Sequence, residues 1–246
     1  CALLLAKPDE GYFLGLMETE DVLGFSKLRL QIETALATRF KAKWLKLYHD
    51  FQGDNVDERA IKNVALSSLS VLEEYHPLLV EQYYNSSNMT DILAALKCAI
   101  WRDIPESEAL AADFYERYHN YPTLVDRWFG LLESNPNLTY QKLMEVIEHP
   151  AFDLENPNRA RAIIGAIGRN RFALAKVGTP LYQWIADQIL ITDKINSITA
   201  ARLITPFTKL RRLPEPLKGE VQLIIEAMRK TPNISSNLSD QLSRLV

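Results

Sequence analysis

The sequence is poor in cysteine and histidine and contains no long apolar run. Among its 246 residues only two are Cys and four are His. The two cysteines, Cys1 and Cys98, are too few for a disulfide framework, which favours a reducing compartment. The longest uncharged apolar run, residues 1–6, is far too short to cross a membrane or to form the core of a signal peptide. We therefore expect a cytoplasmic protein without a membrane span.

Familiar catalytic motifs are also missing. The sequence contains no glycine-rich phosphate loop, no Gly-x-Ser-x-Gly elbow and no His-Glu-x-x-His zinc motif. Glu116 and His119 have the Glu-x-x-His spacing that di-iron bundles use, but no second pair accompanies them, so a surface ion pair is the simpler interpretation. We expect no catalytic residue, metal site or cofactor within this chain.

Charge is unevenly distributed along the chain. Residues 1–155 contain 14 basic and 25 acidic side chains, whereas residues 156–246 contain 14 basic and 6 acidic ones. A basic last third is compatible with solvated helix faces, a nucleic acid, an acidic partner surface or an anionic substrate group. Because the basic residues are spread singly and form no dense run, we expect no nucleic-acid partner.

The pattern of apolar residues is helical almost throughout. Apolar side chains recur at three and four positions, no glycine lies between residues 54 and 129, and prolines divide the rest into short segments. The helices that we predict span residues 26–50, 57–75, 77–84, 89–102, 106–119, 122–133, 138–148, 157–168, 180–192, 197–209, 215–229 and 235–245. Short helices in succession, without a sheet, predict an all-α superhelical array of stacked helix pairs, a HEAT-like or armadillo-like α-solenoid. No repeat recurs cleanly enough to define its unit.

Arg161 lies on an unusual face of its predicted helix. In helix 157–168 it shares that face with Gly165 and Gly168. A glycine in a helix interior costs about 1 kcal/mol relative to alanine, so two on one face indicate that something approaches the backbone closely. Either another helix or a ligand could do so.

Arg202 is predicted to lie between two apolar sides of helix 197–209, where it should be partly desolvated. A planar guanidinium in such a place needs an anion or several acceptors, and it suits a carboxylate. With one predicted helix between them, Arg161 and Arg202 should occupy equivalent helices and face the same concave side. From the residues alone, a structural salt bridge is the preferred interpretation for each, with ligand contact as the alternative.

Five stretches together carry a resemblance to a known family. They are Asn88-Met89-Thr90-Asp91, Asp126-Arg127-Trp128-Phe129, His149-Pro150-Ala151-Phe152, Asn156-Pro157-Asn158-Arg159-Ala160-Arg161 and Ala201-Arg202-Leu203-Ile204-Thr205-Pro206-Phe207. In combination they resemble the C-terminal domain of bacterial aminopeptidase N, within the M1 family of zinc metallopeptidases. The resemblance runs through nearly the whole chain and is strongest from about residue 84 to residue 212.

The resemblance implies that residues 1–246 form a single helical C-terminal domain of a larger aminopeptidase, whose N-terminal and catalytic domains are absent from this sequence. Such a domain would cap the catalytic domain of its own protein, which holds the zinc ion, and would restrict how peptides reach it. The family's zinc motif and its Gly-Ala-Met-Glu-Asn motif do not occur here, so this chain alone should be inactive.

Arg161 and Arg202 match two arginines that, in that family, project toward the substrate cavity. The resemblance therefore implies that both bind the peptide substrate of an enzyme that removes N-terminal residues. A different class of function remains open beside it. The chain could be a free-standing helical-repeat scaffold that binds a protein partner on its concave face.

Overall fold

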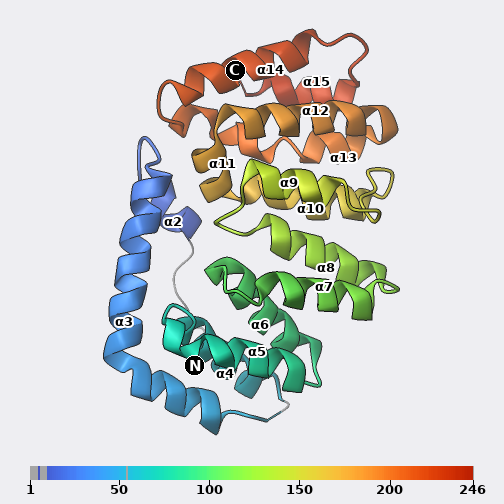
Figure 1. The fold of residues 1–246 in the computed structure, drawn as a ribbon. Helices are drawn as coiled ribbons and strands as arrows, with labels where there is room; N and C mark the ends of the chain where they lie inside the picture. Colours follow the sequence, from blue (N-terminus) through green and yellow to red (C-terminus); the bar gives the residue numbers. More distant parts are fainter. Residues whose placement is uncertain (1–4, 6–9, 54, 246) are drawn as a thin grey trace. The chain divides into compact units, whose positions relative to one another are not determined.

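The computed structural model describes residues 5, 10–53 and 55–245, and these residues form helices without any strand (Figure 1). Cys1 lies outside the described residues. The α-helices are α2 Glu10–Gly15, α3 Val22–Asp50, α4 Val56–Leu69, α5 His76–Asn85, α6 Met89–Arg102, α7 Ser107–Tyr118, α8 Pro122–Glu133, α9 Tyr140–Ile147, α10 Pro157–Arg169, α11 Arg171–Val177, α12 Thr179–Ile195, α13 Ser197–Arg202, α14 Leu217–Lys230 and α15 Ser236–Ser243. Two 3₁₀ segments, η1 Glu73–Tyr75 and η2 Thr205–Arg212, accompany them. The predicted all-α class is confirmed.

Four parts of the helix prediction are wrong. Helices α2 and α11 were not predicted, the predicted helix 57–75 is divided into α4 and η1, and the predicted helix 197–209 is divided into α13 and η2. The second division falls before Pro206, which has no N–H to donate and cannot continue an α-helix from its interior. In the described residues no helix is both long enough and apolar enough to cross a membrane.

The chain consists of two compact units. Unit 1 comprises residues 1–12 and 24–119, and unit 2 comprises residues 13–23 and 120–246. In unit 1, helix α6 contacts α4, α5 and α7. Its buried apolar side chains are Ile92, Ala95, Leu96, Ala99 and Ile100. The prediction that this helix is buried between its neighbours is confirmed.

The start of α6 is held by a buried polar cluster. Asn88 caps the helix, because its Oδ1 accepts a hydrogen bond from the backbone N–H of Asp91 at 2.9 Å. The Asp91 carboxylate is 1% exposed and accepts hydrogen bonds from Lys62 Nζ at 2.5 Å and Asn63 Nδ2 at 2.7 Å. Although burial raises the pKa of Asp91, hydrogen bonds from Lys62, Asn88 and Asn63 lower it below its usual value. The cluster joins α4 to α6.

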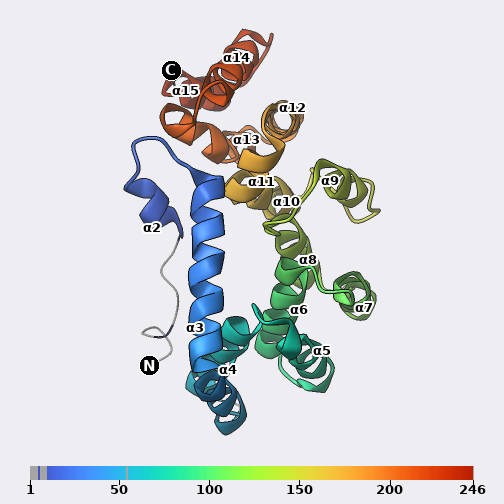
Figure 2. The ribbon, with the colours of Figure 1, turned by 60° about the vertical axis from the view of Figure 1, so that its left-hand side comes forward.

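In unit 2 the helices stack in pairs, as the sequence predicted. Helix α8 contacts α10, α12 contacts α13 and α14, and α14 contacts α15 (Figures 1 and 2). The largest fully buried side chains of this unit include Phe129, Leu143, Tyr182 and Phe207. Helix α10 contacts α8, α11, α12, α13 and η2, so it is the element that most of unit 2 packs against.

Asn170 joins three of these helices. Its Nδ2 donates to the backbone oxygen of Glu133, the last residue of α8, at 2.9 Å and to that of Asn135 at 2.7 Å. Its Oδ1 accepts from the backbone N–H of Ala173 at 3.1 Å and so caps α11. Helix α11 then ends at Gly178, whose φ of 72° suits a residue without a Cβ. Helix α11 therefore has an N-cap at Asn170 and a C-cap at Gly178.

Glu133, at the end of α8, carries a buried carboxyl group whose loss of contact with water is not offset by hydrogen bonds from the described residues. The residue is 0% exposed, and neither Oε1 nor Oε2 has a hydrogen-bond partner among the residues that the structure describes. Burial raises the pKa of Glu133 well above its usual value of 4.5. The folded chain therefore keeps this group protonated at pH values where the unfolded chain ionises it.

Replacing Glu133 with methionine should make the free energy of unfolding less dependent on pH. A raised folded-state pKa contributes stability that is fully present below the unfolded pKa and is lost as pH rises toward the folded pKa. Glu133→Met should therefore gain about 1–3 kcal/mol over wild type at pH 8 and much less at pH 4.5, measured by urea denaturation. Glu148→Gln, at an exposed position, is the control. An equal gain in the free energy of unfolding at both pH values would contradict a raised pKa of Glu133 in the folded chain.

Candidate functional site

The start of α10 is fixed by local capping. Asn156 Oδ1 accepts hydrogen bonds from the backbone N–H groups of Asn158 at 2.9 Å and Arg159 at 3.4 Å. Pro157 occupies the first turn, where a missing N–H costs nothing. The predicted cap is confirmed. It places Arg159 and Arg161 in the first turns of the helix.

Arg159 is the buried guanidinium of the site. Its Nε donates to Asp126 Oδ1 at 2.6 Å, its Nη1 donates to the backbone oxygen of Ala151, and its Cζ lies 5.1 Å from the centroid of the Phe129 ring. The side chain is 8% exposed. Burying a charge is tolerated only where its donors are satisfied and an opposite charge is near. Arg159 therefore ties α10 to α8 and to the loop before α10.

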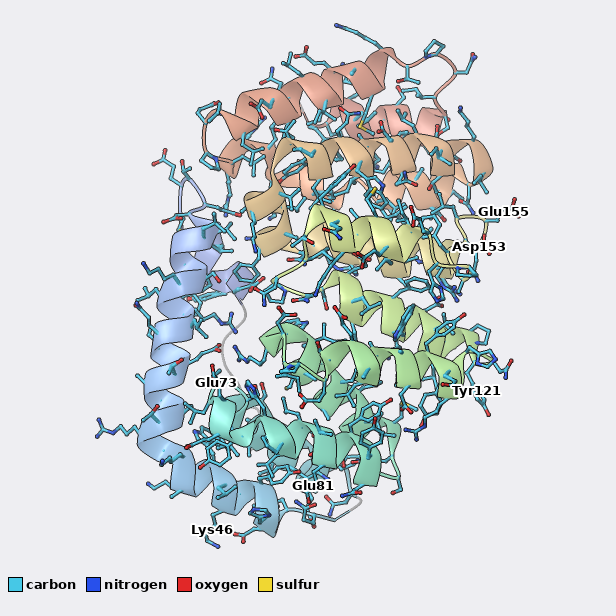
Figure 3. The ribbon with its side chains drawn as sticks, viewed as in Figure 1. Lys46, Glu73, Glu81, Tyr121, Asp153 and Glu155 are labelled. Atoms are coloured by element: carbon cyan, nitrogen blue, oxygen red, sulfur yellow. The ribbon has the colours of Figure 1, made fainter. Side chains whose placement is uncertain are left out.

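That loop begins at His149, which packs against the same aromatic cluster. The His149 ring centroid lies 5.0 Å from that of Trp128, and its Nδ1 accepts a hydrogen bond from the backbone N–H of Ala151 at 3.2 Å. Burial and then the nearby Arg159 charge lower the pKa of His149. Farther along, Asp153 and Glu155 stand at the outer end of the loop (Figure 3). The backbone N–H of Glu155 donates to Asp153 Oδ1 at 2.8 Å.

Three of the stretches that carry the resemblance thus meet in one place. Residues 126–129, 149–152 and 156–161 supply the Arg159 ion pair, the aromatic cluster and the α10 cap. The burial of Arg159 could not be predicted from neighbouring residues, because its partner Asp126 is 33 positions away. These residues form a structural framework that positions the first turns of α10, where Arg161 lies.

Arg161 is half-buried, and within the described part of the chain it has a polar partner but no acidic one. Its Nη2 donates to Asn158 Oδ1, three residues earlier on the same helix. Glu155 and Asp153 precede the helix, yet neither forms an ion pair with Arg161 in the part of the chain that the structure describes. The preferred structural salt bridge is therefore not found for this arginine among the described residues.

The glycines on the face of Arg161 serve close packing. A Cβ added to Gly168 would lie 3.0 Å from Pro206 Cδ, and one added to Gly165 would lie 3.8 Å from Leu203 Cδ2 and 3.2 Å from Arg169 Nη1. The approach that the sequence indicated is thus made by the segment that follows α13. Of the two alternatives, packing against another helical segment is confirmed, and Arg161 lies one turn before this contact.

Arg202 is placed differently from the prediction. It is the last residue of α13 and is exposed, so the expected partial desolvation is wrong. Because the helix ends there, Leu203 and Ile204 turn inward and no longer flank the arginine, while Ile198 on the other predicted apolar side is 60% exposed. Two helices, α11 and α12, separate α10 from α13, where one was predicted.

Neither Arg161 nor Arg202 has an ionic partner within the described ranges 10–53 and 55–245. Helix α10 contacts both α13 and η2, and the contact at Gly165 involves Leu203, the residue after Arg202. Arg161 and Arg202 therefore belong to two helices of unit 2, α10 and α13, that contact each other. Whether they face a common concave surface stays a prediction.

The described residues provide no metal-binding group. No three His, Cys, Asp or Glu side chains come together there as possible ligands. The His119 ring is hydrogen-bonded through Nδ1 to the backbone oxygen of Glu116 at 2.8 Å, so the surface ion pair expected for this spacing is replaced by a side-chain-to-backbone contact. This part of the chain does not fit a zinc ion.

Comparison with known proteins gives consistent matches along the whole chain. A model of the family described as "Domain of unknown function (DUF3458_C) ARM repeats" matches residues 1–246. The chain is 27% identical over 251 residues to aminopeptidase N of Haemophilus influenzae, covering 98% of this chain and 29% of that protein. It is 25% identical over 254 residues to aminopeptidase N of Escherichia coli, covering 99% and 29%.

A solved structure has the same fold. The crystal structure of Legionella pneumophila aminopeptidase A in complex with aspartic acid aligns with a TM-score of 0.89 and 24% sequence identity, covering 99% of this chain and 31% of that chain. The chain thus matches the C-terminal region of aminopeptidase N and spans about 29% of the length of these curated relatives.

Removing the Arg159 guanidinium should destabilise unit 2. Arg159→Met leaves the partly buried Asp126 carboxylate without its cation, which should lower the free energy of unfolding by about 3 kcal/mol. Arg127→Met, at an exposed neighbour, should change it by less than about 0.5 kcal/mol. Adding Asp126→Leu to Arg159→Met should recover part of the loss, because neither charge then remains. Equal losses for Arg159→Met and Arg127→Met in urea denaturation would refute a structural role for Arg159.

Proposed function

Because the chain belongs to the DUF3458_C family of ARM-repeat domains, we propose that it is the C-terminal helical domain of a cytoplasmic zinc aminopeptidase. Its partners are then the catalytic domain of the same protein, which holds the zinc ion, and the peptide substrate. The helical domain caps the catalytic domain and restricts how peptides reach it. The similarity to two aminopeptidases N over nearly the whole chain supports this proposal, and the two cysteines among 246 residues support the reducing compartment.

Arg161 and Arg202 contribute to peptide binding in this proposal. The observation that carries it is that both guanidinium groups lack an acidic partner among the described residues, in a stretch where basic side chains outnumber acidic ones 14 to 6. Unpaired guanidinium groups attract the carboxylate of a short peptide and donate hydrogen bonds to its carbonyl oxygens. They bind and orient the peptide while its free amine is held by the catalytic domain, and they take no part in bond cleavage.

The 246-residue chain by itself should fold but should not hydrolyse peptides. Purified chain with added zinc is expected to release no alanine from alanyl substrates, because the described residues bring together no metal ligands. Circular dichroism checks that the protein is helical under the assay conditions. Zinc-dependent turnover that co-purifies with the chain and is lost with a chelator would contradict the proposal that catalysis belongs to another domain.

In the longer protein, losing either arginine should affect peptides more than small substrates. Arg202→Ala and Arg161→Ala should each raise KM for tri- and tetrapeptides about tenfold, while KM for a single-residue amide and kcat change little, because only peptides extend to the helical domain. Arg229→Ala, at an exposed position on α14, is the matched control. Equal changes in KM for both substrate types would leave the two arginines a structural role.

A further inference from the structure

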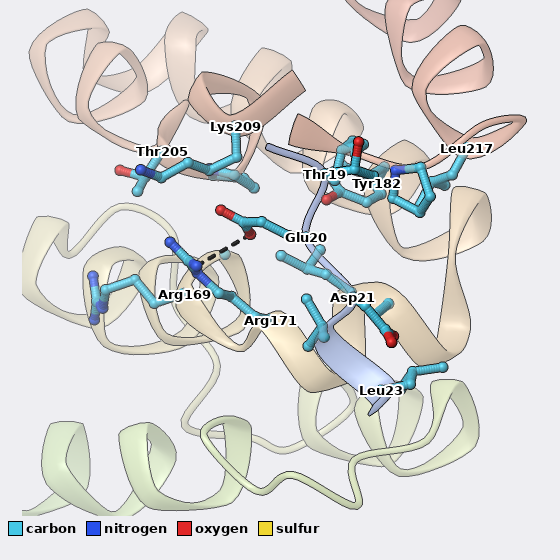
Figure 4. Close-up of a pocket in the computed structure, with 17 residues that line it drawn as sticks. Thr19, Glu20, Asp21, Leu23, Arg169, Arg171, Tyr182, Thr205, Lys209 and Leu217 are labelled. Carbon is cyan, nitrogen blue, oxygen red and sulfur yellow. Dashed lines mark hydrogen bonds and ion pairs between the residues drawn. The ribbon is translucent and has the colours of Figure 1, made fainter. Parts of the chain in front are cut away.

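Unit 2 contains a pocket separate from Arg161 and Arg202. It has a volume of about 500 Å³ and lies between the segment Thr19–Leu23, the α10–α11 junction and η2 (Figure 4). Most of its wall is apolar, and the apolar side chains that line it include Val22, Leu174, Ala175, Pro206, Leu213 and Leu217. A pocket of this size and lining is typical of small-molecule sites.

The one buried carboxylate of the pocket is already neutralised. Glu20 is 4% exposed, its Oε2 lies 3.1 Å from Arg171 Nη1, and its Oε1 lies 3.9 Å from Arg212 Nη1. Its backbone N–H donates to the Arg212 oxygen at 2.8 Å, which fastens the segment to the end of η2. With two guanidinium groups on one carboxylate, the positive charge exceeds the negative charge at this wall.

Two further cations line the pocket and have no acidic partner among the described residues. Arg169 and Lys209 line it, and neither makes an ion pair or a side-chain hydrogen bond with any other residue that the structure describes. Figure 4 shows both on the same side of Glu20, whereas Asp21 points to the opposite side. An anionic head group placed beside Arg169 and Lys209 would meet two cations and would keep its apolar body against the far wall.

We propose that this pocket binds a small molecule in which an apolar chain ends in a carboxylate, with the carboxylate held by Arg169 and Lys209. The apolar chain lies against Leu174, Ala175 and Leu217, where it gains burial. The carboxylate gains charge-assisted hydrogen bonds from Arg169 and Lys209, which make no ion pair within the described ranges. A free medium-chain acid and the last residue of an apolar peptide share this chemistry. The inference is independent of aminopeptidase activity, because it concerns binding to unit 2 alone.

The first test compares ligands that differ only in head group or chain. Octanoate and N-acetyl-leucine are titrated into the 246-residue chain by isothermal titration calorimetry. Tighter binding of octanoate indicates a free medium-chain acid as the ligand, and tighter binding of N-acetyl-leucine indicates the last residue of an apolar peptide. Octanamide, which has the same chain without the charge, should bind about tenfold more weakly than octanoate, and acetate, which lacks the chain, should not bind detectably. Octylammonium binding as tightly as octanoate would overturn the proposal in favour of recognition by Glu20.

The second test changes the pocket. Arg169→Gln with Lys209→Gln should weaken octanoate binding by about tenfold or more, whereas Arg229→Gln with Lys230→Gln, which removes two exposed cations of α14, should leave it unchanged. Ala175→Phe fills the pocket and should abolish binding, with circular dichroism confirming that the variant is folded. Octanoate binding that survives Ala175→Phe, or falls equally in both double variants, would show adsorption elsewhere on the protein and would defeat the proposal.

Discussion

The buried guanidinium of Arg159 is the contact on which the arrangement of unit 2 depends. A charge that is 8% exposed is stable only because Asp126, the Ala151 carbonyl and the Phe129 ring surround it. Those partners come from α8 and from the loop before α10, so the contact sets where α10 begins relative to both. Helix α10 contacts α8, α11, α12, α13 and η2. A shift of α10 would therefore displace each of these elements.

The second constraint is the presence of two glycines, Gly165 and Gly168, on one face of α10. Gly168 lets Pro206 approach so closely that a Cβ would lie 3.0 Å from the proline ring. The chain can therefore end α13 at Arg202, turn, and continue as η2 directly against α10. The same close approach makes Gly168, Thr205 and Pro206 part of the wall of the apolar pocket. The exposed position of Arg202 and the shape of the pocket thus share one physical cause.

Features set by neighbouring residues could be predicted from the sequence, and features set by distant contacts could not. Asn88 and Asn156 cap α6 and α10 through bonds to backbone groups two or three residues away, and both starts were predicted. Helix α11 and the end of α13 were missed. The first depends on Asn170, which also binds the end of α8, and the second on the packing of Pro206 against Gly168. The exposure of Arg202 follows from that second contact and has no local signal.

The basic residues in the last third of the chain have two different roles. A count of charges in the sequence cannot distinguish them. Arg159 and Arg161 are two positions apart, but two helical positions differ by about 200°, so one faces α8 and the other does not. Arg159 and Arg171 each neutralise a carboxylate and hold elements together. Arg161, Arg169, Arg202 and Lys209 have no carboxylate partner among the described residues. Of these two groups, only the second has positive charge available to bind an anion, because the arginines of the first are already paired with carboxylates.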